Sequence, residues 1–213
     1  MTDRPFSRRD LLRLGLTAGA ASLAGACGWQ GGPLLPALRG AARLNDWVGE
    51  KVFLSHRHLA KDPAAWALEV GGKVRKPMRL TLEMLQALPR VRYTIKHHCV
   101  EGWSAIATWT GAPLASVIHL VEPTDEARYV RFDTFDANYY NGWDLESALH
   151  PQTILAYAFN DRPLDAAHGA PLRVYSSVKL GYKMTKYLTR MTFTSERPGG
   201  YWEDQGYPWL GGV

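Results

Sequence analysis

One short segment of the sequence concentrates the residue types that bind metals or attack substrates. It reads His97-His98-Cys99-Val-Glu101, so one thiol lies beside two imidazoles and a carboxylate. A thiolate suits soft or high-valent metals, and a neighbouring imidazolium lowers the pKa of a thiol. A closed zinc site is disfavoured, because it needs four ligands and the sequence offers no C-x-x-C partner. The segment therefore predicts either a metal ligand or a cysteine nucleophile, with Cys99 at its centre.

The cysteine count sets Cys99 apart. The chain has only two cysteines, Cys27 and Cys99. Cys27 follows a leader-like N-terminus and lies in a Gly- and Pro-rich stretch, so we do not expect a disulfide between the two. A lone internal thiol in an oxidising compartment is either buried and inert or used chemically.

The first 26 residues have the form of an export signal. Arg8 and Arg9 come before an apolar run that ends in Ala-Gly-Ala, directly before Cys27. The run is about 13 residues long, shorter than the ~20 that a spanning helix needs. Paired arginines are typical of the twin-arginine route. We therefore predict a signal over 1–26, a tether over 27–44 and a folded domain over 45–213, in the periplasm or otherwise exported. A membrane anchor or amphipathic helix is the alternative, and Cys27 is a potential lipid-attachment site.

The composition is that of a globular protein and argues against nucleic-acid binding. The chain has 213 residues, 46% of them hydrophobic, and its net charge of +5 is spread along the sequence rather than gathered in a basic stripe. No G-x-G-x-x-G or Walker loop occurs, so nucleotide binding through those devices is unsupported. His97, His119 and His150 are expected to have structural roles only.

Patterns of apolar residues predict many short strands and a few short helices. Strands are expected over 66–71, 91–96, 129–133, 155–160, 172–175 and 187–193, and helices over 81–88, 114–120 and 145–150. Thr81 is the N-cap candidate of the first helix, which Pro89 ends. A turn is expected at 109–113, and an irregular stretch before Trp143. This mixture predicts an α+β fold rather than a doubly wound sheet.

Several motifs follow one another in a fixed order along the chain. They are Cys99-Val-Glu-Gly-Trp-Ser, Trp109-Thr-Gly-Ala-Pro-Leu, Leu145-Glu-Ser-Ala-Leu-His-Pro, His168-Gly-Ala-Pro-Leu-Arg, Lys179-Leu-Gly-Tyr-Lys-Met-Thr-Lys and Gly200-Tyr-Trp-Glu-Asp-Gln-Gly-Tyr. Together they resemble the sulfite-oxidase-like molybdopterin-dependent oxidoreductases over roughly residues 52–213. The resemblance is closest to the bacterial branch that includes the periplasmic methionine-sulfoxide reductase catalytic subunit. It implies a sulfite-oxidase-type molybdopterin-binding fold.

The resemblance also implies which residues bind the cofactor. Cys99 would be the thiolate ligand of molybdenum, beside the two dithiolene sulfurs of one pterin. Thr134 stands at a position that forms a hydrogen bond to the cofactor, and His168 and Arg173 stand at contacting positions. His168 departs from the asparagine expected in the reductase.

A loop near the end of the domain matches the part of the family that holds the pterin phosphate. The matching residues are Met184, Thr185 and Lys186. The assignment also makes chemical sense, because nearby Lys179 and Lys183 add cations, which together with loop amides suit a dianion. A solvated basic loop is the alternative.

Two further residues are candidates for catalysis. Glu101, two residues past Cys99, would lie on the same side of an extended chain, either near the metal or in a structural hydrogen bond. In the resemblance, His56 stands where sulfite oxidases carry an arginine that helps to bind sulfite. Imidazole is a poorer permanent anion clamp than guanidinium, which puts sulfite in doubt as the substrate. A core position is the alternative for His56.

The implied activity is two-electron oxygen-atom transfer by an exported molybdenum-cofactor oxidoreductase, on a sulfoxide or a related small substrate. Sulfite dehydrogenase-like oxidation and an inactive, cofactor-free binding module are the alternatives. No C-x-x-C-H haem motif occurs, so electrons are expected from a redox partner protein, a cytochrome. No added dimerisation domain is recognised, so a monomer is expected, with the membrane contacted only through the signal or a lipid on Cys27.

Overall fold

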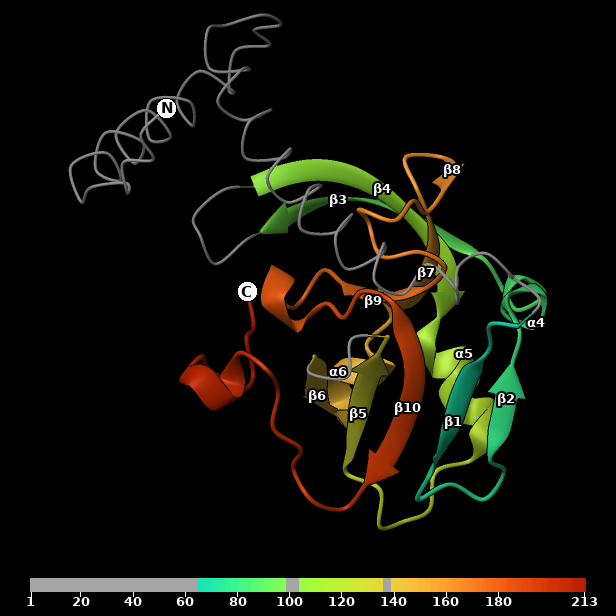
Figure 1. Ribbon diagram of the computed structural model, residues 1–213, viewed down its shortest axis with the longest axis vertical. Helices are drawn as coiled ribbons and strands as arrows, with labels where there is room; N and C mark the ends of the chain where they lie inside the picture. Colours follow the sequence, from blue (N-terminus) through green and yellow to red (C-terminus); the bar gives the residue numbers. More distant parts are fainter. Residues whose placement is uncertain (1–64, 99–103, 136–138) are drawn as a thin grey trace, which may run out of the picture. The chain divides into compact units, whose positions relative to one another are not determined.

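The computed structural model describes residues 65–98, 104–135 and 139–213, and these form two five-stranded sheets with a few short helices (Figure 1). The first sheet has the order β2-β1-β10-β5-β6. Its strands are β1 (Leu68–Gly72), β2 (Met78–Leu80), β5 (Tyr129–Thr134), β6 (Tyr140–Asp144) and β10 (Leu188–Thr194). β1 and β10 pair in parallel, and the other neighbours pair antiparallel.

The second sheet carries the strand that leads toward Cys99. Its strands are β3 (Val91–His98), β4 (Ser104–Pro113), β7 (Thr153–Phe159), β8 (Arg162–Pro163) and β9 (Arg173–Ser176). They follow the order β3-β4-β7-β8, and β9 also pairs with β7. The family-like fold class predicted from the sequence, an α+β arrangement of short strands with few helices, is confirmed.

Capping side chains explain where two of the short helices begin. Helix α4 (Leu82–Gln86) starts after Thr81, whose side chain accepts a hydrogen bond from the N–H of Met84 at 3.2 Å. Helix α6 (Leu145–Leu149) starts after Asp144, whose carboxylate accepts from the N–H of Ser147 at 2.6 Å. Helix α5 (Leu114–Val121) follows β4 directly. The 3-10 turns η2 (Gly181–Lys183) and η3 (Glu203–Gln205) lie in the last third of the chain.

Two hydrophobic clusters divide the interior. The larger joins the first sheet to the helices and includes the fully buried Phe132, Trp143 and Leu155. The smaller lies within the second sheet and contains Ala107, Trp109, Ile154, Ala156, Leu164, Tyr175 and Met184. This smaller cluster forms the floor of the candidate site described below.

Two local predictions were wrong. The turn expected at 109–113 is the second half of β4, because Gly111 lets the strand approach β7 closely: a Cβ there would lie 2.2 Å from the C=O of Leu155. The stretch expected to be irregular before Trp143 contains β6, which pairs with β5. At β4 the partner strand β7 is distant in sequence, whereas β6 pairs with the strand that precedes it along the chain.

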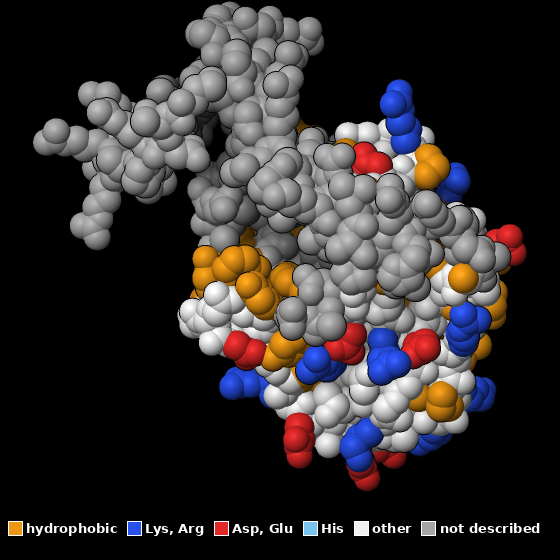
Figure 2. Space-filling view, viewed as in Figure 1, with side chains coloured by type: hydrophobic (Ala, Val, Ile, Leu, Met, Phe, Trp, Pro, Cys, Tyr) orange, Lys and Arg blue, Asp and Glu red, His pale blue; other side chains and the backbone are white. Residues whose placement is uncertain are grey.

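Other predictions fall outside the described residues. These are the signal over 1–26, the tether over 27–44, and the site residues His56, Cys99 and Glu101. Within the part of the chain that the structure describes, no helix has the length and apolar character needed to cross a membrane. On the face shown in Figure 2, basic and acidic side chains are interspersed over the described surface.

Candidate functional site

Arg173 is a buried cation at the start of β9. Its residue is only 5% exposed, Nη1 donates to the C=O of His168 at 3.0 Å, and the guanidinium lies 4.7 Å from the centre of the Trp109 ring. Burial lowers the pKa of Arg173 to about 10. Its Nε finds no hydrogen-bond partner among the described residues. A buried cation in this state calls for an anion as its partner.

The loop between η2 and β10 lies against the same place. The backbone C=O of Thr185 accepts from the N–H of Val174 at 2.9 Å, which ties the loop to β9. Thr185 is fully buried, and its Oγ1 has no partner within the described ranges. Met184 packs into the smaller hydrophobic cluster. Thr185 therefore offers a second buried donor close to β9 and Arg173.

Lys186 adds a cation to this group. Its Nζ donates to the C=O of Ala167 at 2.6 Å, in the loop whose His168 C=O binds Arg173. The segments that contain Gly169 and Lys186 pack closely. Gly169 has a φ of +100°, and a Cβ built on it would lie 2.8 Å from the Cβ of Lys186. Arg173 and Lys186, which come from separate segments of the chain, thus bind neighbouring carbonyls of one short loop, and Thr185 directly precedes Lys186.

We call Arg173, Thr185 and Lys186 the cationic cluster. His97 lies beside it, although the sequence predicted only a structural role for this histidine. Its ring stacks on Tyr175 at 5.9 Å, and its Nε2 lies 2.9 Å from where a Cβ on Gly181 would stand. Burial, together with the smaller effect of the positive charges of Arg173, His98 and Lys186, lowers the pKa of His97 to about 4. The imidazole is therefore neutral at pH 7. Sequence alone offered only one signal for this, its place two residues before Cys99.

His168 is held in one orientation at the edge of the cluster. Its Nδ1 pairs with Asp165 Oδ1 at 2.6 Å, and its ring stacks on Phe159 at 4.2 Å. Burial raises the pKa of Asp165, but hydrogen bonds from the His168 side chain and N–H outweigh this and hold that pKa below its usual range. Asp165 thus fixes both the position and the ring orientation of His168.

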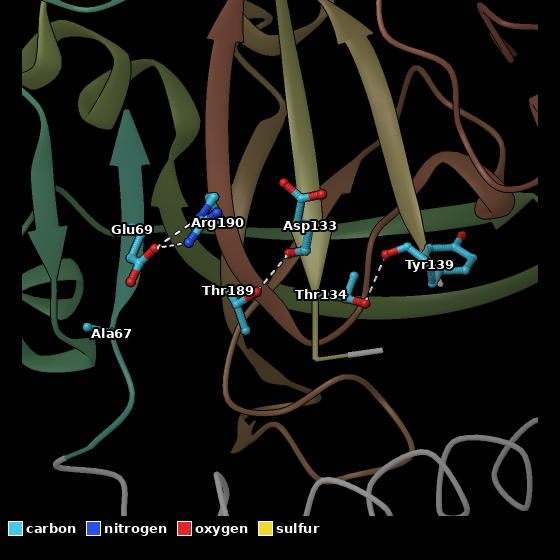
Figure 3. A pocket seen from close by; sticks show the side chains of 7 residues that line it. All are labelled: Ala67, Glu69, Asp133, Thr134, Tyr139, Thr189 and Arg190. Carbon is cyan, nitrogen blue, oxygen red and sulfur yellow. Dashed lines mark hydrogen bonds and ion pairs between the residues drawn. The ribbon is translucent and has the colours of Figure 1, made fainter. Parts of the chain in front are cut away.

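Thr134 pairs in register with Leu188, two residues after Lys186, and lines an open pocket of about 380 Å³ (Figure 3). The pocket is lined by Ala67, Glu69, Asp133, Thr134, Tyr139, Thr189 and Arg190. In Figure 3, Arg190 reaches Glu69, and the Thr134 hydroxyl donates to the C=O of Tyr139 at 3.1 Å. Tyr139 links the two regions, because the charge of Arg173 acts on its hydroxyl, whose pKa burial raises to about 12.

The cationic cluster and the pocket differ in whether their polar groups already have partners. The charged groups that line the pocket already form ion pairs. The cluster holds buried donors that the described residues leave unused. We therefore assign the anionic end of a ligand to the cluster, where phosphate or a similar group fits the donors. Among the described residues, no three His, Cys, Asp or Glu side chains gather in a way that could hold a metal ion.

Comparison with known proteins identifies relatives of this chain. Residues 56–202 match a family profile described as oxidoreductase molybdopterin binding domain. A protein of Azospira oryzae, provisionally named protein-methionine-sulfoxide reductase subunit YedZ1, is 45% identical over 71% of this chain and 57% of its own. The protein-methionine-sulfoxide reductase catalytic subunits MsrP of Xanthomonas axonopodis and Campylobacter jejuni are 34% and 30% identical, each over 65% of this chain and about half of theirs (48% and 52%). The match therefore spans about half the length of these relatives.

A solved structure shares the fold. It is the sulfane dehydrogenase SoxCD from Paracoccus pantotrophus, with a TM-score of 0.59 and 20% sequence identity, over 64% of this chain and 40% of that one. At this identity the likeness concerns the fold alone.

Proposed function

Because the chain belongs to the family of oxidoreductases with a molybdopterin-binding domain, we propose that it is an exported molybdenum enzyme that reduces a sulfoxide by oxygen-atom transfer. The family makes it an oxidoreductase whose domain binds molybdopterin. Beyond that, we propose the identity of the metal, the substrate, the export of the protein and the roles of individual residues.

The observation that carries the proposal is a buried cation, Arg173, that forms no ion pair within the part of the chain that the structure describes. Arg173, Thr185 and Lys186 converge at the edge of the second sheet, and the Nε of Arg173 and the Oγ1 of Thr185 are buried without partners among the described residues. A pterin phosphate is a dianion that accepts several charge-assisted hydrogen bonds, so it matches this donor set. The residues present therefore fit the group that the family binds.

The roles of the side chains follow from this arrangement. Arg173, Thr185 and Lys186 would bind the phosphate end, and the thiolate of Cys99, which follows β3, would hold the molybdenum. When bound, the cofactor supplies the two-electron transfer of an oxygen atom. His168, oriented by Asp165, presents its ring beside the phosphate donors and would contact the cofactor. We retain Thr134 as a cofactor contact, and Met184 as the packed residue that supports its loop.

The names of the relatives favour a sulfoxide as the substrate. The reaction would consume one sulfoxide, two electrons and two protons, and would yield one sulfide and one water. The electrons would come from a redox partner protein, for which we propose a cytochrome. Glu101 and His56 are the proposed catalytic side chains near the substrate, and the imidazole of His56 disfavours sulfite.

The central experiment combines metal analysis with two assays on the purified full-length protein. We expect molybdenum and pterin in equimolar amounts, and oxidation of reduced benzyl viologen with methionine sulfoxide as acceptor. Sulfite with ferricyanide should give a much lower rate. Activity with sulfite alone would favour the dehydrogenase alternative. Protein that binds no pterin after expression in a cofactor-producing host would support the inactive module instead.

A matched pair of lysine variants tests the phosphate site. Losing one charge-assisted hydrogen bond costs roughly 1.5–3 kcal/mol, or about 10- to 150-fold in cofactor affinity. Lys186→Ala should therefore lower the pterin content after dilution. Lys76→Ala should not, because Lys76 forms a surface ion pair with Glu122. If both variants retained the same amount of pterin, the loop would be a solvated surface loop and not a phosphate site.

A further inference from the structure

Residues 203–213, called here the clasp segment, lie beside the loop that precedes the proposed phosphate-binding residues (Figure 1). Three hydrogen bonds join the two: Leu180 N–H to the C=O of Gly211 (2.7 Å), Lys179 Nζ to the C=O of Leu210 (2.7 Å) and Tyr182 Oη to the C=O of Pro208 (2.5 Å). Residues 179–182 are therefore held by a segment some 30 residues further along the chain.

Gly211 shows how closely the two segments pack. Its φ is +50°, and a Cβ there would lie 2.5 Å from the Cγ of Lys183 and 2.7 Å from the Oη of Tyr182. A larger residue would push the clasp segment away from the loop. The contact thus depends on glycine and reaches Lys183 itself.

Lys183 is the buried anchor of this contact. It is fully buried, and its Nζ donates to the C=O of Gly142 at 2.8 Å and pairs with the carboxylate of Glu203. The Glu203 side chain is only 4% exposed. Burial lowers the pKa of Lys183 to about 8, against the opposing effect of Glu203. Removing one partner would leave a buried charge unpaired.

The backbone at Lys183 is fixed as well. Its C=O accepts from the indole N–H of Trp143 at 3.0 Å. The next three residues are Met184, Thr185 and Lys186, so any shift of Lys183 passes directly into the proposed phosphate site. Lys183 itself points away toward Gly142 and Glu203, and does not contribute a donor to that site.

We propose that Lys183 and Glu203 are positioning residues, which hold residues 184–186 in place for the anionic end of the cofactor. The proposal rests on the function proposed above, and it adds the clasp segment to the binding machinery. A buried ion pair can often be replaced by apolar residues without loss of stability. Its hydrogen bonds, however, set one position for the lysine, which a flexible apolar side chain would not.

The test uses the full-length holoprotein and measures the rate at which pterin is released, by fluorescence after oxidation. The variants are Glu203→Gln and the double variant Lys183→Met/Glu203→Leu. Substituting a residue that holds a ligand-binding residue in place typically weakens affinity by about 10- to 100-fold. We therefore expect pterin release to be roughly 10- to 100-fold faster in both variants. In the double variant, Tm should stay near the wild-type value.

Two comparisons make the outcome decisive. Leu85→Ala, at the buried position of α4, should lower Tm without changing pterin release. Release rates that simply follow Tm across these proteins would overturn the positioning role. If Lys186→Ala releases pterin faster but the clasp variants do not, only this inference fails. If none of the variants changes release, the proposed phosphate site fails with it.

Discussion

Replacing Arg173 by methionine should have opposite effects on the apo-protein and on cofactor binding. Burial lowers the pKa of Arg173 from 12.5 to about 10. Each pKa unit corresponds to about 1.4 kcal/mol, so burying this cation costs the apo-protein on the order of 3 kcal/mol. Methionine has a similar length and carries no charge, so Arg173→Met removes that cost.

The variant also loses a hydrogen bond. Nη1 of Arg173 donates to the C=O of His168, and an unsatisfied carbonyl costs about 1–3 kcal/mol. The two effects leave the apo-protein about as stable as wild type, or up to about 2 kcal/mol more stable. Cofactor binding should weaken by about 10- to 150-fold, because one charge-assisted bond to the phosphate is lost.

Urea unfolding of apo-protein at pH 7 and pterin retention after dilution measure the two effects. Arg92→Met is the control, since Arg92 forms an exposed ion pair with Asp161, and such surface pairs contribute little to stability. That control should retain its cofactor. A loss of more than about 3 kcal/mol of apo-protein stability in Arg173→Met, together with normal pterin retention, would refute an anion site at Arg173.

Three further predictions concern export, the metal and the edge of the site. Arg8→Lys/Arg9→Lys should leave cofactor-loaded protein in the cytoplasm, as cell fractionation would show; unchanged export would contradict a twin-arginine signal. Cys99→Ser should abolish turnover and change the Mo(V) paramagnetic signal with little change in circular dichroism, and a wild-type rate would exclude Cys99 as the ligand. Asp165→Asn should lower the unfolding free energy by up to about 1 kcal/mol at pH 7. Folding lowers the pKa of Asp165, so its contribution to the unfolding free energy is present above the usual aspartate pKa. That contribution should vanish as the pH falls through the lowered value. An equal loss of stability in the variant at pH 7 and at pH 2 would argue against the ion pair with His168.

Local signals in the sequence predicted much of the secondary structure. Thr81 caps α4 as expected, and α5 and α6 occupy the predicted ranges. Most strands lie within a few residues of their predicted bounds, because alternation is a property of neighbouring residues. The failure at β4 occurs where a distant strand, β7, supplies the pairing that the local pattern does not reveal. Strand β6 pairs with its neighbour in sequence, β5, so a distant partner does not explain that failure.

The order of the motifs, read from the sequence alone, predicted the family and the candidate residues Arg173, Thr185 and Lys186. Their side-chain chemistry is a property of residue type, and so it can be read without coordinates. Only the tertiary structure decided that Arg173 is buried with no carboxylate paired to it among the described residues, that His97 lies beside it, and that Lys183 turns away to Glu203. Burial and ion pairing depend on which distant segments fold against each other, and no local pattern in the chain carries that information.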